Sequence, residues 1–254
     1  MSKRNTKQRR HMILSLLTEQ GEVSVESLSG LFDISEVTIR KDLTELEKNG
    51  LLMRKYGGAV LMPSNIIQED TCEEVSNRKL SIANAAVDLI KDHNRIIIDS
   101  GSTTAALINQ LSKRNGLVVM TNSLPVANAL QEIENEPTLL MTGGTWDSHS
   151  DSFQGQVAES VLRSYDFDQL FIGADGIDLE RGTTTFNELV GLSRVMSEVA
   201  REVILMVESE KIGRKIPNVE LPWDSIDVLI TNNDLSQEQQ QKIESHNVRV
   251  IRAQ

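Results

Sequence analysis

Seven short apolar runs, separated by stretches with helical patterns, occupy the chain from Leu80 to its end. Helices placed between strands imply crossover connections, and crossover connections join strands that run in parallel. Strands that are apolar along nearly their whole length are typical of a sheet covered on both faces. The sequence therefore predicts an α/β domain with a largely parallel sheet, whose strands we expect at residues 96–98, 117–120, 139–141, 170–172, 203–207, 228–230 and 248–251.

The first 62 residues follow a different pattern, which predicts three helices and then two short strands. Apolar residues recur at spacings of three or four, as on the buried stripe of a helix. The three sets are Ile13, Leu16 and Leu17; Val25, Leu28 and Phe32; and Ile39, Leu43 and Leu46. Gly21 is placed to end the first helix, and Ser24 and Ser35 are placed to cap the second and third. Residues 51–61, which contain a glycine pair, predict a β-wing.

A linker is expected between these two patterns. Pro63 and the polar, acidic stretch that follows it to Arg78 show no periodic pattern, which favours an extended connection. We therefore expect a winged helix-turn-helix domain at residues 1–62, a linker at 63–78 and the α/β domain at 79–254.

Charge is divided unevenly between the two domains. The net charge of −11 would by itself disfavour binding to nucleic acid, because phosphates repel an acidic protein. Residues 1–62 contain ten Lys and Arg against eight Asp and Glu, however, whereas the rest of the chain contains 16 against 29. Five of the basic residues fall in the first ten positions: Lys3, Arg4, Lys7, Arg9 and Arg10. This basic arm suits contact with DNA phosphates, and the alternative is a solvated, frayed terminus.

The third helix of the N-terminal domain carries side chains that could read DNA. Because Ile39 and Leu43 face the core, its basic, hydroxyl and small apolar side chains lie on the outer surface. Arg and Lys donate to guanine, and Thr and Val contact the thymine methyl group, when the start of such a helix enters the major groove. The candidate DNA-contacting residues are Ser35, Val37, Thr38, Arg40, Lys41, Thr44, Arg54 and Lys55. The alternative is a three-helix bundle whose outer face is only solvated.

A second candidate site begins where the first strand of the α/β domain ends. There the sequence runs Asp99, Ser100, Gly101, Ser102, Thr103 and Thr104 and leads into a predicted helix. Hydroxyl donors, a glycine that permits close approach and the amides of a helix start together suit a phosphate group. The alternative is an ordinary helix cap.

Polar groups also follow other predicted strands. Because the carboxyl ends of parallel strands meet at one edge of the sheet, we expect these groups to line the same crevice. They are Thr121, Asn122, Gly143, Gly144, Asp175, Glu188 and Lys211. A phosphorylated, polyhydroxylated ligand would suit this set. The glycine pair could instead be a simple turn, residues 183–185 a strand segment, and the carboxylates of Asp175, Asp178 and Glu188 structural.

Three runs in the N-terminal domain resemble the DeoR family of bacterial repressors of sugar catabolism. They are VSVESL at 23–28, VTIRKDL at 37–43 and RKYGGA at 54–59. The resemblance implies that residues 23–42 form the helix-turn-helix motif, with Arg40 and Lys41 on the operator. We accordingly expect a repressor that binds double-stranded operator DNA as a homo-oligomer, dimer or tetramer, and is released by a phosphorylated sugar or sugar alcohol.

The α/β domain resembles the effector domain of the same family. That domain is itself similar to ribose 5-phosphate isomerase in its hydroxyl-rich phosphate loop, its glycine and aspartate motif and its late lysine. Within the family, the stretches 186–188, 200–206, 213–215 and 217–219 look closest to the sorbitol (glucitol) operon repressors, with amino-sugar operon repressors second.

A sugar-phosphate isomerase with a DNA-binding head is the competing class. The isomerase pattern has a lysine and a glycine run shortly after its aspartate motif, whereas residues 182–188 here contain no lysine. Without that cation, the enediolate formed by proton transfer from carbon would lose several kcal/mol of stabilisation. We therefore expect no enzymatic activity.

No cofactor, metal or membrane partner is expected. His11, His93, His149 and His246 are scattered, and Cys72 is the single cysteine, so a zinc site has little support. No apolar run approaches the ~18 residues that a membrane helix needs, and the N-terminus is polar and basic, unlike a signal peptide. These features predict a cytoplasmic protein.

Overall fold

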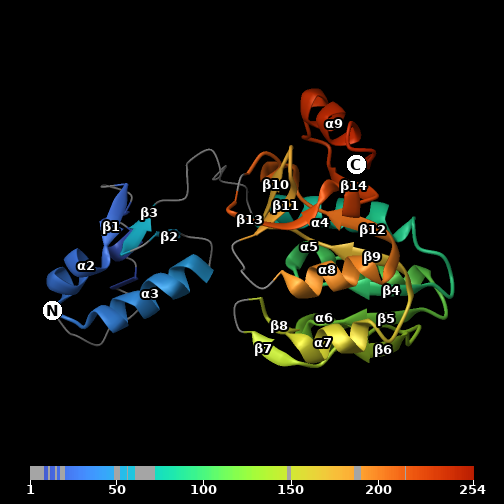
Figure 1. The fold of residues 1–254 in the computed structure, drawn as a ribbon, viewed down its shortest axis with the longest axis horizontal. Coiled ribbons are helices and arrows are strands. Elements are labelled where there is room, and N and C mark those ends of the chain that lie inside the picture. Colours follow the sequence, from blue (N-terminus) through green and yellow to red (C-terminus); the bar gives the residue numbers. More distant parts are fainter. Residues whose placement is uncertain are drawn as a thin grey trace. The chain divides into compact units, whose positions relative to one another are not determined.

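The computed structural model describes residues 9–10, 12–14, 16–17, 21–48, 52–55, 57–60, 72–147, 150–185, 190–214 and 216–254. The chain divides into two compact units, Met1–Asp70 and Thr71–Gln254 (Figure 1).

The first unit is a helical motif with a small antiparallel sheet. The described residues between 9 and 17 are helical, and they precede β1 (Glu22–Ser24), α2 (Val25–Phe32), α3 (Glu36–Lys48), β2 (Met53–Lys55) and β3 (Gly58–Val60). Its sheet has the order β1-β3-β2 with antiparallel pairs throughout. The predicted β-wing is therefore confirmed, and β1 adds a third strand that the sequence did not indicate.

The predicted helix stripes and caps of the first unit are also confirmed. Ile13, Leu28, Ile39 and Leu43 are all buried in one core. The Ser27 amide donates to the Ser24 hydroxyl over 3.0 Å, which caps α2. At the start of α3 the Thr38 amide donates to the Ser35 hydroxyl over 3.3 Å. Gly21 follows the first helix with a φ of +76°, and its amide donates to the Leu17 carbonyl.

The second unit is built on a seven-stranded sheet whose neighbouring strands are all parallel. Its order is β15-β14-β12-β9-β4-β5-β6. The strands are β4 (Arg95–Ile98), β5 (Val118–Thr121), β6 (Thr138–Met141), β9 (Phe167–Ile172), β12 (Ala200–Met206), β14 (Val228–Asn232) and β15 (Arg249–Ala253). All seven predicted strands are present, and the parallel α/β fold is confirmed.

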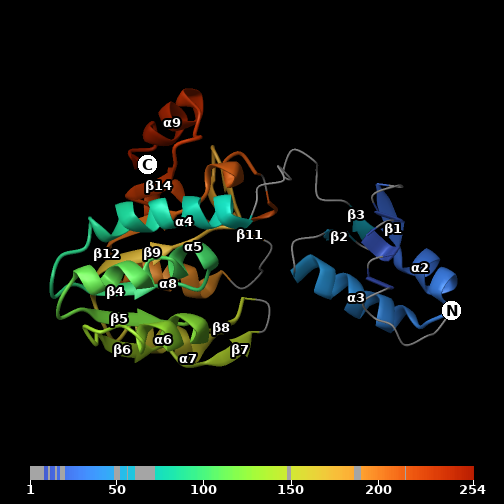
Figure 2. The same ribbon diagram turned by 180° about the vertical axis from the view of Figure 1, so that it is seen from behind.

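Helices cover both faces of this sheet (Figures 1 and 2). Successive strand residues alternate between two cores: Ile97 packs in one, and Ile96 and Ile98 in the other. The core of Ile97 is closed by α7 (Gln156–Leu162) and α8 (Gly191–Glu198), with α9 (Gln237–Glu244) at its margin. The opposite core is closed by α4 (Cys72–Val87), the 3₁₀ helix η2 (Ile108–Lys113) and α6 (Leu124–Leu130). Burial on both faces explains why the strands are almost wholly apolar.

Smaller elements lie beyond the main sheet. A three-stranded antiparallel sheet has the order β10-β11-β13, and β7 pairs with β8 in a hairpin. These strands are β7 (Thr145–Asp147), β8 (Ser152–Gln154), β10 (Gly176–Asp178), β11 (Gly182–Thr185) and β13 (Asn218–Pro222). One-turn helices are α5 (Ser102–Ala105), η3 (Ser209–Lys211) and η4 (Trp223–Ser225).

The expected linker needs one correction. Helix α4 begins at Cys72, so residues 72–78 of the predicted linker are helical. The buried stripe of α4, which includes Ile82 and Ala86, lies in its second half. Its first half is polar and hides the helical period.

Gly57 and Gly58 of the wing are required for different reasons. Gly57 has a φ of +78°, in the region that favours glycine. A Cβ atom on Gly58 would lie 2.1 Å from the backbone oxygen of Val23 on β1. The approach of β1 to β3 therefore leaves no room for a side chain at Gly58.

Replacing Gly58 with alanine should open the β1–β3 pair and destabilise the first unit by about 1–3 kcal/mol, because the clash is with backbone. Hydrogen exchange of the amides in residues 22–24 and 58–60 would measure the loss without interference from the second unit. Gly30→Ala in α2 is the matched control, because nothing lies within 4 Å of its Cβ position. That change should stabilise the helix by up to ~1 kcal/mol. Equal protection in both variants would contradict this account of Gly58.

Candidate functional site

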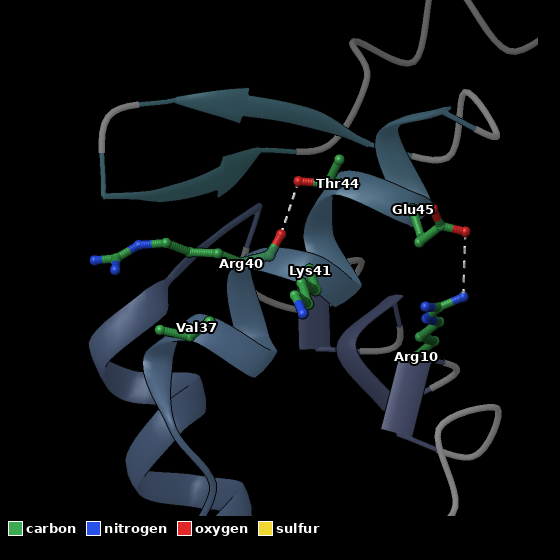
Figure 3. Close-up of a pocket in the computed structure, with 6 residues that line it drawn as sticks. All are labelled: Arg10, Val37, Arg40, Lys41, Thr44 and Glu45. Atoms are coloured by element: carbon green, nitrogen blue, oxygen red, sulfur yellow. Dashed lines mark hydrogen bonds and ion pairs between the residues drawn. The ribbon is translucent and has the colours of Figure 1, made fainter. Parts of the chain in front are cut away.

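The outer surface of α3 is the first candidate site. Ile39 and Leu43 are buried, whereas Val37, Arg40 and Lys41 are exposed on the other side of the helix. An open pocket on this surface is lined by Arg10, Val37, Arg40, Lys41, Thr44 and Glu45 (Figure 3). Helix α3 thus presents three of the predicted DNA-contacting side chains to solvent.

The other predicted DNA-contacting residues mainly hold the motif together. Ser35 and Thr38 bond to each other through their hydroxyl groups over 2.9 Å at the start of α3. The Thr44 hydroxyl donates to the Arg40 carbonyl over 2.8 Å, and Arg54 Nη1 on β2 donates to the Thr44 hydroxyl over 3.1 Å. These contacts fix the wing against α3. Lys55 ends β2, and its side chain lies outside what the structure describes.

Arg40 has a partner within its own helix. Its Nη2 atom lies 2.6 Å from Glu36 Oε2 in a pair spaced i, i+4, with both side chains about half exposed. Exposed pairs of this kind contribute little to stability, on the order of 0.3–0.5 kcal/mol. An external acceptor can therefore displace Glu36 at little cost.

At two of its five positions the predicted basic arm is helical and held by a carboxylate, which rules out the alternative of a frayed terminus there. Arg9 and Arg10 are helical, and their Nε atoms donate to the buried carboxylate of Asp42 over 2.6 and 2.9 Å. An ionised carboxylate that is 3% exposed needs such partners. Lys3, Arg4 and Lys7 lie outside the described residues.

The second candidate site lies where the strand order of the main sheet reverses. Starting from β4, the chain adds β5 and β6 on one side and then β9, β12, β14 and β15 on the other. The segments that leave β4 and β9 therefore diverge to opposite faces. A crevice at such a point is where ligands of open parallel sheets bind. Asp99 follows β4 here, and Asp175 follows β9.

A hydrogen-bond network joins the β4 turn to the end of β5. Asn122 Nδ2 donates to Asp99 Oδ1 over 2.8 Å, and the Ser100 amide donates to Asn122 Oδ1 over 3.1 Å. The buried Thr104 hydroxyl lies within hydrogen-bonding distance of the carbonyl oxygens of Asp99 and Gly101, at 2.8 and 2.9 Å. The predicted Ser/Thr turn is thus held by hydrogen bonds to Asn122 and within itself, and α5 behind it is a single turn.

Lys211 reaches the same end of the sheet from the segment that follows β12. Its Nζ atom donates to the Ala174 carbonyl over 3.0 Å, next to Asp175. The Thr185 hydroxyl donates to Asp175 Oδ2 over 2.7 Å. Burial lowers the pKa of Lys211, and the charges of Asp175 and Glu208 oppose that shift. The structure therefore brings Asp99, Asn122, Asp175 and Lys211 together, as the sequence predicted.

Two buried carboxyl groups at this site have raised pKa values. Burial raises the pKa of Asp99 to about 6, against the opposing hydrogen bonds from Asn122 and Ser100. Burial likewise raises the pKa of Glu220 to about 7, against the hydrogen bond from Ser193, with the charges of Asp99 and Asp175 adding to the rise. Strongly perturbed carboxyl groups of this kind are typical of functional sites.

Four residues near this site were missed by sequence reasoning. Glu220 lies on β13 and accepts from the Ser193 hydroxyl over 2.6 Å. Arg78 and Lys79 of α4 lie 3.7 and 3.8 Å from Glu208, and Lys79 and Arg214 act on the pKa of Lys211. No local motif marks these positions, because their proximity to the site depends on the order of the strands.

Other predicted residues have structural roles. A Cβ atom on Gly144 would lie 2.6 Å from the Gln154 carbonyl, so this glycine permits the close approach of β8. The Thr121 hydroxyl is buried and accepts from the Ser123 amide. Asp178 accepts from the Glu180 amide and from Arg181 in the β10–β11 turn. Gly143 directly precedes Gly144 in the chain. Ser102 and Thr103 belong to α5. Glu188 lies outside the described residues.

Among the residues that the structure describes, no group of three or more His, Cys, Asp or Glu side chains is arranged to hold a metal ion. Within the same ranges, no helix is long and apolar enough to cross a membrane.

Both units match known protein families. Residues 9–65 match the family described as "DeoR-like helix-turn-helix domain", and residues 74–233 match the "DeoR C terminal sensor domain". Together the two matches take in both candidate sites.

Relatives and solved structures differ in how closely they match. A putative aga operon transcriptional repressor of Escherichia coli O157:H7 is 40% identical over 97% of this chain and 93% of its own length. The HTH-type transcriptional regulator GlpR of Haloferax volcanii is 35% identical over 96% of each chain. Ribose 5-phosphate isomerase A of Methanocaldococcus jannaschii is 22% identical, with a TM-score of 0.40 over 53% of each chain. This last match spans about half of the isomerase and carries no argument about activity.

Asp99→Asn should stabilise the second unit at pH 8 and leave it nearly unchanged near pH 4. Between the ordinary pKa of 3.8 and the folded value of about 6, the unfolded chain loses the proton that the folded chain keeps. The free energy of unfolding of the wild-type protein therefore falls by about 1–3 kcal/mol as the pH rises through this window. The neutral amide of the variant does not titrate, so the variant avoids this loss. Urea unfolding followed by the fluorescence of Trp146 and Trp223 measures it.

Two further variants test this interpretation. For Glu220→Gln the gain in stability over the wild type should continue to grow up to about pH 7, because the pKa of Glu220 is higher than that of Asp99. Asp88→Asn, at a side chain that is 80% exposed, should change stability by less than about 0.5 kcal/mol at either pH. A pH-independent difference for Asp99→Asn would show that its carboxyl is not destabilised by burial.

Proposed function

The chain belongs to the DeoR family of helix-turn-helix transcriptional regulators, and we propose that it represses a sugar or sugar-alcohol catabolic operon until a phosphorylated sugar or polyol binds its second unit. The observation that carries this proposal is the meeting of Asp99, Asn122 and Lys211 at the β4–β9 switch point, inside the region that matches a sensor domain.

The chemistry of the residues at this end of the sheet supports a ligand with a phosphate and several hydroxyl groups. Lys211, Lys79, Arg78 and Arg214 supply four cations, which share the acids Glu208, Glu210 and Asp175. Cations of this kind form strong, charge-assisted hydrogen bonds with phosphate oxygens. Carboxyl and amide groups, here those of Asp99, Asn122, Asp175 and Glu220, suit sugar hydroxyls.

The DNA-binding half of the proposal rests on the exposed part of α3. We propose that Val37, Arg40 and Lys41 enter the major groove and that Arg54 and the wing support them. A repressor of this type binds as a symmetric dimer or tetramer, which presents two recognition helices to half-sites about one turn of DNA apart or a multiple of it. Such a regulator acts where the DNA is, in the cytoplasm.

Enzymatic activity is not favoured. The relatives named above are regulators. The stretch after the aspartate motif, where the isomerase pattern has a lysine, is the threonine-rich strand β11. Assays of the purified protein with pentose and hexose phosphates distinguish the two classes.

The operon is a finer question. The relative at 40% identity is named for the aga operon, which does not specifically support the predicted similarity to sorbitol operon repressors. We therefore keep the coarser class, a sugar or sugar-alcohol operon, as the proposal.

Induction requires the two units to be coupled. The effector must bind the DNA-incompetent arrangement more tightly than the DNA-competent one, and each ~1.4 kcal/mol of that difference gives about a tenfold change in operator affinity. A thermal-shift screen of sugar and polyol phosphates would identify the effector, since a ligand at 100 times its Kd adds about 2.7 kcal/mol of stability.

Arg40→Ala and Lys41→Ala should each weaken operator binding by roughly tenfold to a hundredfold, the cost of one good base contact. The fold should survive, because both side chains are exposed. Fluorescence anisotropy with an operator selected by the protein from a random DNA pool measures the change. Lys91→Ala, an exposed lysine of the second unit, removes the same charge and should have no effect. Wild-type affinity in the double variant would remove these residues from the reading surface.

Lys211→Gln should bind the operator normally but lose at least tenfold in affinity for the effector, because a phosphate loses its buried cation. Calorimetry with the compound found in the thermal-shift screen gives the affinity. Lys242→Gln, a surface lysine paired with Glu180, is the control. A folded Lys211→Gln protein with full effector affinity would place the phosphate elsewhere.

A further inference from the structure

We propose that Arg10, held by the buried carboxylate of Asp42, is a fixed contact for a phosphate of the operator backbone, and that Asp42 is the residue that positions it. The inference rests on the proposed DNA-reading role of α3. It selects Arg10 from the five residues of the predicted basic arm and assigns Asp42 as its anchor.

Asp42 binds two consecutive arginines that face different surroundings. Its Oδ2 accepts from Arg9 Nε over 2.6 Å and its Oδ1 accepts from Arg10 Nε over 2.9 Å. The Arg9 side chain is 10% exposed, whereas that of Arg10 is 29% exposed and lines the pocket on α3. The two guanidinium groups thus share one buried carboxylate, and of the two it is Arg10 that reaches the surface of α3.

The second acidic neighbour of Arg10 holds it only weakly. Glu45 Oε2 lies 3.8 Å from Arg10 Nη1, beyond hydrogen-bonding distance, and the Glu45 side chain is 44% exposed (Figure 3). Exposed pairs at such a distance are readily exchanged for a stronger partner. The bond to Asp42 uses the Nε–H group, and a guanidinium has five N–H donors in a fork that matches phosphate oxygens.

The position of Arg10 favours a phosphate over a base. In helix-turn-helix proteins the N-terminal residues of the recognition helix reach the bases, whereas preceding elements cross the sugar-phosphate backbone. Arg10 approaches α3 beside Asp42 and Glu45, more than one turn beyond Val37. Because Asp42 fixes the guanidinium before DNA arrives, binding loses less side-chain entropy than with a mobile arginine.

The test measures binding to DNA over a series of salt concentrations. Two duplexes are used: the operator selected from a random pool and a scrambled duplex of equal length. Arg10→Ala should lower the slope of log K against log salt by about 1 and weaken binding to both duplexes by a similar factor, as expected for a phosphate contact. Glu45→Gln should tighten binding to both duplexes.

Arg9→Ala is the matched control. It removes the neighbouring charge from the same carboxylate but not from the pocket, so it should lower the melting temperature of the first unit and leave the salt slope unchanged. Asp42→Asn should weaken binding while keeping the slope, because Arg10 keeps its charge and loses its anchor. If circular dichroism shows that the Arg10→Ala protein does not fold, Glu45→Gln and Arg10→Lys test the inference in its place. Arg10→Lys should keep the salt slope and lose affinity for DNA.

A folded Arg10→Ala protein with the wild-type slope would overturn the inference, as would equal slope losses for Arg9→Ala and Arg10→Ala. Wild-type affinity in Glu45→Gln and in Arg10→Lys would do the same. Failure of the wild-type protein to select any DNA would overturn the proposed function itself, so the two failures are distinguishable.

Discussion

The parallel arrangement of the main sheet is the constraint on which the second unit depends. Each strand must be entered from the same end, so every chain segment leaves the sheet at the opposite end. Asp99, Asn122, Asp175 and the segment of Lys211 are far apart in sequence but follow β4, β5, β9 and β12, and the strand order brings these four ends together. The strands of the sheet are largely apolar, and Asp99, Asn122, Asp175 and Lys211 all lie beyond the strand ends. The contribution of the sheet is to hold the loop ends at fixed positions.

The strands of this sheet could be predicted because burial on both faces makes each one a short apolar run. Of the small sheet β10-β11-β13, only residues 183–185 were indicated, as an alternative strand segment that β11 confirms. The sheet as a whole could not be predicted, because β11 is Gly-Thr-Thr-Thr and all four residues are nonetheless buried. Their hydroxyls are satisfied by distant groups such as Asp175 and the Arg214 carbonyl. Glu220 was missed for the same reason, since β13 lies beside β11 only in the folded chain.

The first unit shows the opposite balance. Its helix stripes and caps were predicted in detail, because they depend on neighbours three or four residues apart. Its charges were harder to interpret. Arg9 and Arg10 belong to a run of basic residues that predicts an arm for DNA phosphates, and the carboxylate that holds them lies 33 and 32 residues away in sequence. Sequence patterns report the local charge and leave the partner across the fold unknown.

The ion pair between Arg40 and Glu36 bears on how such a protein finds its target. An arginine that rests on an internal acceptor at 2.6 Å loses little when the DNA in front of it lacks a suitable base, because it keeps that acceptor. In the proposed role of α3, a matching site therefore gains from Arg40 only the difference between its own acceptor and Glu36. DNA without such an acceptor leaves no bare guanidinium and costs little. The pair thus lowers the penalty for non-cognate DNA, and discrimination by Arg40 depends on how far a base acceptor exceeds a half-exposed carboxylate.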